Sequence, residues 1–156
     1  MDIALIPDKT SEADIAITNN DLMIVDGFDT AVYISLFTDA RDTDSDDANP
    51  SGGYWGDGLD SSTIAVSPLG SLLWKYARAV ITSDVINSIK TTCSNALKWM
   101  IDDGIAGSIA VTSKETGNNA YEFGISISKP GNTGASYLYR INWDAQAGKI
   151  SFAGAS

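Results

Sequence analysis

Short apolar segments separated by polar residues open the chain. Ile3 and Leu5 alternate with small or polar residues, Ile15 and Ile17 do the same, and Leu22-Met23-Ile24-Val25 is a continuous apolar run. A period of two is typical of strands with one apolar face. The pattern therefore predicts short strands near residues 2–6, 13–18 and 22–25. We expect no internal repeat in the chain.

The next segments carry a helical pattern. Asp26, with Asp29 three positions later, resembles a helix start, and Val32 and Leu36 continue an apolar face, which predicts a helix over about 28–39. Ser67-Pro68 is a favourable helix entry, and the leucines that follow it predict a second helix over about 69–80.

The strongest periodic signal follows Thr82-Ser83-Asp84. Apolar residues recur there at spacings of three and four, which predicts a third helix over about 83–103 with a continuous buried stripe: Val85, Ile86, Ile89, Cys93, Ala96, Leu97 and Met100. Gly104 suits the left-handed position that ends a helix.

After Gly104 the period changes to two. Alternating apolar positions run through Ile109 and Val111, Tyr121 to Ile127, and Tyr137 to Trp143, and Ile150 and Phe152 complete a short edge strand. The predicted fold is therefore one α+β domain over residues 1–156, in which a helical layer packs on an antiparallel sheet over about 106–153. The N-terminal strands either join this sheet or form a small separate ribbon. An open sheet leaves an edge to which another chain can add a strand.

The long predicted loop over residues 42–63 contains two large rings. Tyr54 and Trp55 stand between glycines in Gly53-Tyr54-Trp55-Gly56-Asp57, so the rings either fold back as a plug on the core or serve as anchors for a partner. Trp74 and Trp99 fall within predicted helices, where core packing is expected. Trp143 ends a predicted strand and either caps the core or presents its ring to a neighbour.

Residues for common catalytic chemistry are scarce. The chain has no histidine and one cysteine, Cys93, which the helical pattern places on a buried face. Asp42-Thr43-Asp44-Ser45-Asp46-Asp47 begins like a calcium loop but lacks the glycine and the glutamate that such a loop needs at its sixth and twelfth positions. We expect no metal and no cofactor.

Paired carboxylates are the one catalytic idea that the composition allows, because glycoside hydrolysis needs only two of them. The glutamates are Glu12, Glu115 and Glu122, and Asp57 follows Trp55-Gly56 in the loop. None of the glutamates stands in an apolar pattern that would raise its pKa for general-acid work. We therefore expect no enzymatic activity.

Acidic charge is concentrated in the first part of the chain. Residues 1–60 hold 14 acidic and 2 basic side chains, and residues 61–156 hold 6 and 8. This acidic charge disfavours binding to nucleic acid and to anionic membranes. It either keeps the protein in solution or steers a basic protein partner toward it. The start of the chain is not typical of a signal peptide, and no apolar run is long enough to span a membrane.

Four blocks in this order resemble a known phage family. They are residues 30–41, the Gly53–Asp57 segment, Gly70-Ser71-Leu72-Leu73-Trp74, and Ala96-Leu97-Lys98-Trp99-Met100-Ile101-Asp102-Asp103-Gly104. Together, over about residues 2–128, they resemble the Mu-like tail baseplate proteins. That family is similar to the sheath-initiating, "lysozyme-like" baseplate wedge proteins of contractile-tailed phages. The wider wedge group has a Glu-Pro-Arg segment where this chain reads Asp102-Asp103-Gly104-Ile105.

The resemblance implies a structural wedge protein of a contractile tail baseplate that acts in sheath initiation. The implied partners are other baseplate wedge proteins and the tail sheath and tail tube proteins. The implied location is the virion, after assembly in the host cytoplasm. The candidate partner contacts are Tyr54, Trp55, Trp143, Ile150 and Phe152. Two alternatives stay open: a carboxylate-based peptidoglycan-cleaving enzyme, and a ligand-binding domain that uses Tyr54 and Trp55 as an aromatic platform.

Overall fold

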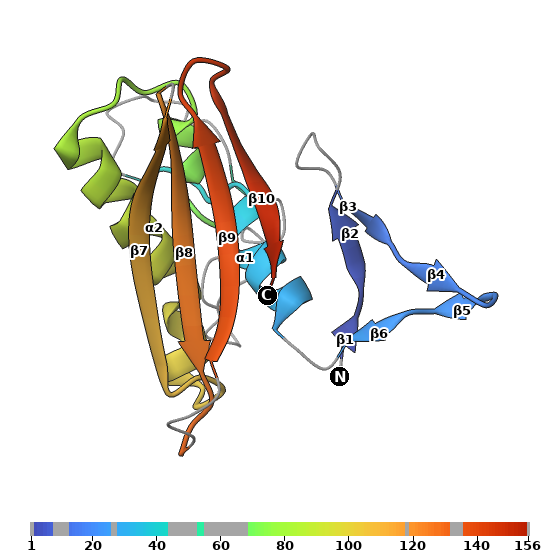
Figure 1. Ribbon diagram of the computed structural model, residues 1–156. Helices are drawn as coiled ribbons and strands as arrows, with labels where there is room; N and C mark the ends of the chain where they lie inside the picture. Colours follow the sequence, from blue (N-terminus) through green and yellow to red (C-terminus); the bar gives the residue numbers. More distant parts are fainter. Residues whose placement is uncertain are drawn as a thin grey trace.

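A computed structural model describes residues 2–7, 13–25, 28–43, 53–54, 69–117, 119–131 and 136–155. Two helices cover one face of a four-stranded antiparallel sheet, and short strand pairs from the N-terminal residues stand beside this body (Figure 1). The predicted α+β class is confirmed. Within the described residues, neither helix combines the length and the apolar content that crossing a bilayer requires.

The sheet is a simple meander in which each strand pairs with the next. Its spatial order is β10-β9-β8-β7, so β10 and β7 form the two edges of the sheet. The alternation seen in the sequence sets the two faces, because side chains of a strand point alternately to opposite sides. The strands are β7 (Ser108–Gly117), β8 (Ala120–Ser128), β9 (Ser136–Asp144) and β10 (Lys149–Ala155).

Helix α2 (Ser83–Asp102) matches the third predicted helix. The Oγ1 atom of Thr82 accepts a hydrogen bond from the Val85 N–H at 3.2 Å, which satisfies one of the unpaired donors at the helix start. At the other end Gly104 adopts φ 71°. The N–H groups of Ile105 and Ala106 then both reach the Met100 carbonyl at 2.8 Å, which ends the helix as predicted.

Helix α1 (Asp29–Phe37) matches the first predicted helix, but its start differs from the expectation. Phe28 is the N-cap residue and no side chain caps the helix there, while Asp26 lies outside the described residues. The acidic Asp29 in the first turn still interacts favourably with the helix dipole.

One core joins these elements. The buried stripe of α2 (Ile89, Cys93, Leu97 and Met100) faces the inner side of the sheet, and Val32 and Leu36 of α1 extend the same core. The sheet contributes alternating inward residues: Phe123, Ile125, Ile127, Tyr139, Ile141 and Trp143. No residue before Phe28 belongs to this core among the described residues.

The second predicted helix is wrong. Residues 69–80 contain only a short 3₁₀ helix, η2 (Leu73–Tyr76). Gly70 has φ 105°, outside the helical region, and Ser71 forms a parallel bridge with Asp39. The leucine spacing suggested a helix, but backbone pairing with the segment after α1 determines the structure at Gly70 and Ser71.

The N-terminal strands form a separate unit, one of the two arrangements left open by the sequence. Three two-stranded antiparallel ladders pair β1 with β6, β2 with β3, and β4 with β5, and none of them joins the main sheet. The strands are β1 (Asp2–Ile3), β2 (Leu5–Pro7), β3 (Ala13–Ile15), β4 (Ile17–Thr18), β5 (Asp21–Leu22) and β6 (Ile24–Val25).

This unit contains a repeat, contrary to the expectation of none. The segments Asp2-Ile3-Ala4-Leu5, Asp14-Ile15-Ala16-Ile17 and Asp21-Leu22-Met23-Ile24 form the three sides of a triangle in Figure 1. Each segment pairs its second residue with the fourth residue of a neighbour, as Ile3↔Ile24, Leu5↔Ile15 and Ile17↔Leu22. The three segments therefore have equivalent environments, related by a pseudo-threefold axis.

The third residues of the repeats close the triangle. The Ala4 N–H donates to the Met23 carbonyl at 2.8 Å, Met23 N–H to the Ala16 carbonyl at 2.9 Å, and Ala16 N–H to the Ala4 carbonyl at 2.9 Å. We call residues 2–7 and 13–25 the three-ladder unit. A hydrogen bond from the Thr30 hydroxyl of α1 to the Ile3 carbonyl, at 2.5 Å, links the unit to the body.

Leu97 tests the assignment of the α2 core face. Leu97 is fully buried and its neighbour Lys98 is exposed. We expect Leu97→Ala to lower the free energy of unfolding by about 2–5 kcal/mol, because it removes buried apolar contacts and leaves a cavity. Lys98→Ala should change it by no more than about 0.5 kcal/mol. Equal losses in denaturant melts of the two variants would contradict the assigned face.

Gly70 tests the backbone pairing that replaces the second predicted helix. A Cβ atom at Gly70 would overlap the Thr38 carbonyl, whereas one at Gly104 would meet nothing within 4 Å, although both glycines have positive φ. Gly104→Ala should therefore cost only the left-handed conformation, about 1–2 kcal/mol. Gly70→Ala should cost about 1–3 kcal/mol more, through the added clash. The check is chemical denaturation of both variants, and a Gly70→Ala loss no larger than that of Gly104→Ala would refute the close packing.

Candidate assembly surfaces

The segment after α1 and the segment before η2 are bound to each other. The Ser71 N–H donates to the Thr38 carbonyl at 2.9 Å, and the Ala40 N–H donates to the Ser71 carbonyl at 2.9 Å. The Ser71 hydroxyl donates to the Leu36 carbonyl at 2.6 Å, and the Trp74 indole N–H donates to the Ala40 carbonyl at 3.1 Å. These bonds hold two blocks of the family resemblance, 30–41 and 70–74, side by side.

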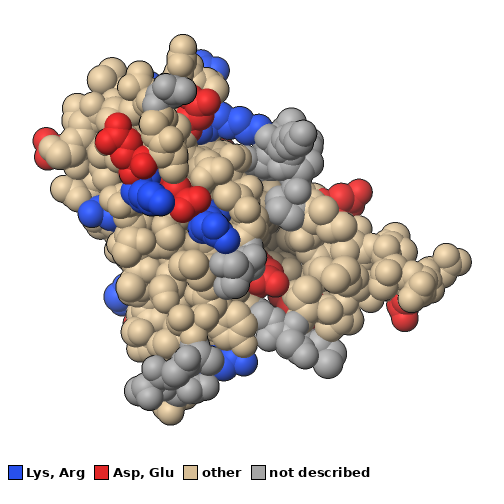
Figure 2. Space-filling model, in the orientation of Figure 1, with Lys and Arg blue, Asp and Glu red and all other residues tan. Residues whose placement is uncertain are grey.

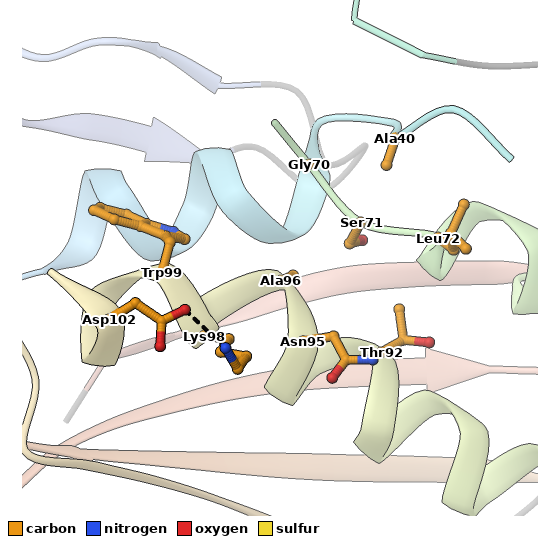
Figure 3. A pocket seen from close by; sticks show the side chains of 10 residues that line it. All are labelled: Ala40, Gly70, Ser71, Leu72, Thr92, Asn95, Ala96, Lys98, Trp99 and Asp102. Carbon is orange, nitrogen blue, oxygen red and sulfur yellow. Dashed lines mark hydrogen bonds and ion pairs between the residues drawn. The ribbon is translucent and has the colours of Figure 1, made fainter. Parts of the chain in front are cut away.

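A third block, 96–104, meets the first two at an open pocket of about 310 Å³. Figure 3 shows Trp99, Lys98 and Asp102 of α2 on one side of this pocket, with Gly70 and Ser71 across from them. The indole N–H of Trp99 donates to the Ser35 hydroxyl at 3.1 Å, so the ring is fixed to α1. Three of the four resemblance blocks thus converge on one surface, which sequence reasoning did not predict, because their separation along the chain gives no signal of contact.

Lys98 and Asp102 form an ion pair at 2.8 Å between successive turns of α2. Both side chains are more than half exposed, so the pair contributes little to stability. The other lining residues include the apolar Leu72 and the small or polar Ala40, Ser71, Thr92, Asn95 and Ala96. The pocket therefore combines one exposed ion pair with apolar, small and polar side chains.

The described part of the aromatic loop lies against the segment after α1. A Cβ atom at Gly53 would be 3.0 Å from the Cβ atom of Arg41, and Tyr54 is half-buried. The choice between plug and anchor stays a prediction for Tyr54. Trp55, the other predicted contact in this loop, and Asp57 lie outside the described residues.

The acidic segment that follows α1 begins with an ion pair. The Asp42 carboxylate accepts a bond from the Lys75 ammonium at 2.5 Å, and the Asp42 side chain is only 6% exposed. This carboxylate therefore ties the segment to η2, while Asp44 and the rest of the calcium-like sequence lie outside the described residues. The described residues contain no cluster of three or more potential metal ligands.

The side chains predicted at the β10 edge turn toward the core. Phe152 packs against Tyr33, Phe37 and Tyr139, with ring centroids 5.8, 6.3 and 6.4 Å away. Ile150 lines a pocket of about 180 Å³ beside Leu36, Leu73 and Ala77. These two side chains fix β10 to the helices, so partner contacts at this edge would come from the main chain and from outward residues such as Ser151.

Trp143 lies in the core. Its side chain is 0% exposed, and its indole N–H donates to the Ala77 carbonyl at 3.2 Å. Of the two alternatives for this residue, the structure places the ring where it caps the core. The buried N–H has a partner, as a buried indole requires.

The carboxylates weighed for hydrolysis are arranged as ordinary surface groups. Glu122 lies on the outer face of the sheet, opposite Lys114 on β7, and Glu115 is exposed near the end of β7. Asp144 lines the same open pocket as Glu122, but its carboxylate accepts the Ala147 N–H at 2.9 Å and so stabilises the turn before β10. Glu12 lies outside the described residues.

Two titratable side chains, Cys93 and Tyr139, have pKa values that are raised by burial. Cys93 is fully buried, and burial raises the pKa of its thiol to about 12, so it stays protonated and inert at neutral pH. Burial also raises the pKa of Tyr139, and the adjacent carboxylate of Asp29 raises it further. The neutral Tyr139 hydroxyl accepts the Phe28 N–H at 3.2 Å, next to the start of α1.

Known proteins resemble this chain over most of its length. The family described as "Phage protein GP46" matches residues 28–134. The "Mu-like prophage FluMu protein gp46" of Haemophilus influenzae is 28% identical over 132 residues, which cover 85% of this chain and 90% of that protein. The "Baseplate protein gp46" of Escherichia phage Mu is 35% identical over 107 residues, which cover 65% of this chain and 70% of that protein.

The family match begins at Phe28, so it excludes the three-ladder unit and includes both helices and the strands up to β8. All four blocks of the resemblance lie within it. From this match and the identity to the Mu protein, the chain belongs to the phage GP46 family.

Proposed function

We propose that this chain is a structural component of a contractile phage tail baseplate, a wedge protein of the sheath-initiating kind. The observation that carries the proposal is its membership of the GP46 family together with its 35% identity to the baseplate protein of phage Mu. Its partners are then other baseplate wedge proteins and the sheath and tube of the tail, and its location is the virion.

The geometry supports assembly rather than turnover. The open pocket between the resemblance blocks is lined by Leu72, Trp99, several small or polar residues and an exposed ion pair. The buried thiol is inert, and the Asp144 carboxylate serves a turn. Contacts through Tyr54 and Trp55 belong to this proposal as a second surface, beside the β10 edge.

Removal of the gene from a phage that encodes this chain tests the proposal. We expect tail tubes without an attached sheath in electron micrographs, because sheath subunits would lack the surface on which the first ring forms. Supplying the chain from a plasmid should restore sheathed tails, and the chain should then be found in purified particles. Normal sheathed tails in its absence would refute the sheath-initiating role.

The same purified protein separates this proposal from a peptidoglycan-cleaving enzyme. Incubation with bacterial cell walls should leave their turbidity unchanged. Clearing that disappears in a Glu122→Gln variant would favour the enzyme instead, and clearing that persists in that variant would point to a contaminant.

Strand addition at β10 is the mode of contact that we propose. β10 is an edge strand of the sheet, in which Ile150 and Phe152 face the core while Lys149 and Ser151 stand on the outward face. The register shifts between Phe152 and Gly154, and such a bulge interrupts regular pairing. An added strand would therefore pair around Ser151 and Phe152.

A matched pair of lysines tests the β10 edge. Ser151 and Asn142 are register partners on the same face, but Ser151 is on the edge strand and Asn142 is one strand further in. Edge lysines hinder the approach of another strand, so Ser151→Lys should weaken association with the neighbouring baseplate proteins by up to about fivefold, measured by quantitative pull-down. Asn142→Lys should not.

Both lysine variants should unfold within about 0.5 kcal/mol of the original chain, because neither position is in the core. Equal association of the two variants would exclude β10 as the contact edge.

A further inference from the structure

We infer that the three-ladder unit is a docking surface for an apolar protein surface bordered by lysine and arginine, on another component of the same particle. The inference rests on the proposed function for its setting. It concerns a part of the chain that precedes the family match, which begins at Phe28.

The unit carries much of the exposed apolar surface of the described chain. Seven of its large apolar side chains are at least 37% exposed, and they are Ile3, Ile6, Ile15, Ile17, Leu22, Met23 and Ile24. A surface patch of this kind marks an interaction site in a soluble protein. Among the described residues, the core cluster takes no side chain from the unit.

The pseudo-threefold repeat gathers five of these side chains on one face. Because side chains alternate along a strand, the second and fourth residues of each repeat share one side of the triangle. Five of these six side chains are from 37% to 71% exposed, with Ile17 the most exposed. The third residues of the repeats point to the opposite side, where Ala4 and Ala16 are buried and Met23 is 43% exposed. One face is therefore a nearly continuous apolar surface.

The unit has little to stabilise it by itself. Its ladders pair two or three residues each, and a single hairpin without a packed face is at best marginally stable in water. A partner that covers the apolar face would supply the missing burial.

The charge of the unit indicates the chemistry of that partner. Residues 2–25 contain five carboxylates and one basic side chain, Lys9. Asp2, Asp14 and Asp21 each accept the N–H of the following residue, at 2.7–2.8 Å, so the negative charges are held at equivalent points around the triangle. In Figure 2 the projecting unit shows red acidic side chains, and the blue basic ones lie over the body.

A second copy of this chain is a poor occupant for the same reason. Two copies would bring their acidic rims together, and each chain already carries a formal charge of −10. Like charges across an interface disfavour association, whereas a basic rim on the partner would favour it.

Photo-crosslinking in assembled particles tests the inference. A photoreactive amino acid replaces Ile17 in one variant and Val80, 80% exposed on the body, in a matched control. We expect the probe at Ile17 to crosslink to one other chain, at an apolar segment that contains lysine or arginine, and the probe at Val80 not to reach that segment. A crosslink from Ile17 only to a second copy, only to its own body, or to nothing in particles that contain the chain would overturn the inference.

Substitutions give a second readout. Ile17→Asp should lower incorporation into particles by about tenfold or more, because a charge would enter the covered apolar face. Val80→Asp should not. Asp14→Asn combined with Asp21→Asn keeps oxygen acceptors for the two N–H groups but removes the charge, so incorporation should fall, with Asp103→Asn as the control at an exposed acidic position.

The two proposals fail separately in these experiments. Absence of the original chain from purified particles would refute the baseplate function and this inference with it. Presence of the chain, with incorporation unaffected by Ile17→Asp and by the double Asn variant, would overturn the docking surface alone and leave the baseplate function standing.

Discussion

The apolar contact between α2 and the inner face of the sheet supports every other feature of the body. Ile89, Cys93, Leu97 and Met100 supply one side of this contact, and alternate residues of β8 and β9 supply the other. Burial of such side chains is the main favourable term in folding. Helix α1, η2 and strand β10 are then attached around this layer, through the aromatic group at Phe152 and through the bonds of Ser71. The candidate surfaces are thus held in place by a framework with a buried apolar interior.

Sequence periodicity predicted the elements of this framework well, since a buried stripe imposes its spacing on the sequence. The stripe of α2 and the alternation from Tyr121 to Trp143 both follow directly from burial on one side. Periodicity failed over residues 69–80, where three leucines stand at helical spacing but only Leu73 lies within the short 3₁₀ helix. Hydrogen bonds between Ser71 and the segment after α1 determine that structure, and bonds between distant segments leave no period in the sequence.

The candidate contacts were harder to predict for the same physical reason. An aromatic or branched residue at a strand end has similar sequence surroundings whether it faces the core or a partner, and only the packing at Trp143 and Phe152 distinguishes the two. The repeated Asp-apolar-small-apolar segments did carry a signal, because equivalent contacts around an axis need equivalent residues. The third copy of the repeat has Met23 where the other two have alanine, and the three copies are unevenly spaced along the chain. Both differences weaken the repeat signal in the sequence.

The triangle of ladders has a topological property that a hairpin does not have. Its first strand pairs with its last, through Asp2↔Val25 and Ile3↔Ile24. The ring of strands is therefore closed by pairing between the two ends of the segment. During synthesis no intermediate length of this segment can form the complete ring, and closure waits until Val25 has left the ribosome. Once shut, the ring places the first residues of the chain beside the start of α1 through the bond between Thr30 and Ile3. A substitution at Ile3 would therefore act on the closure of the ring and on its junction with α1 at the same time.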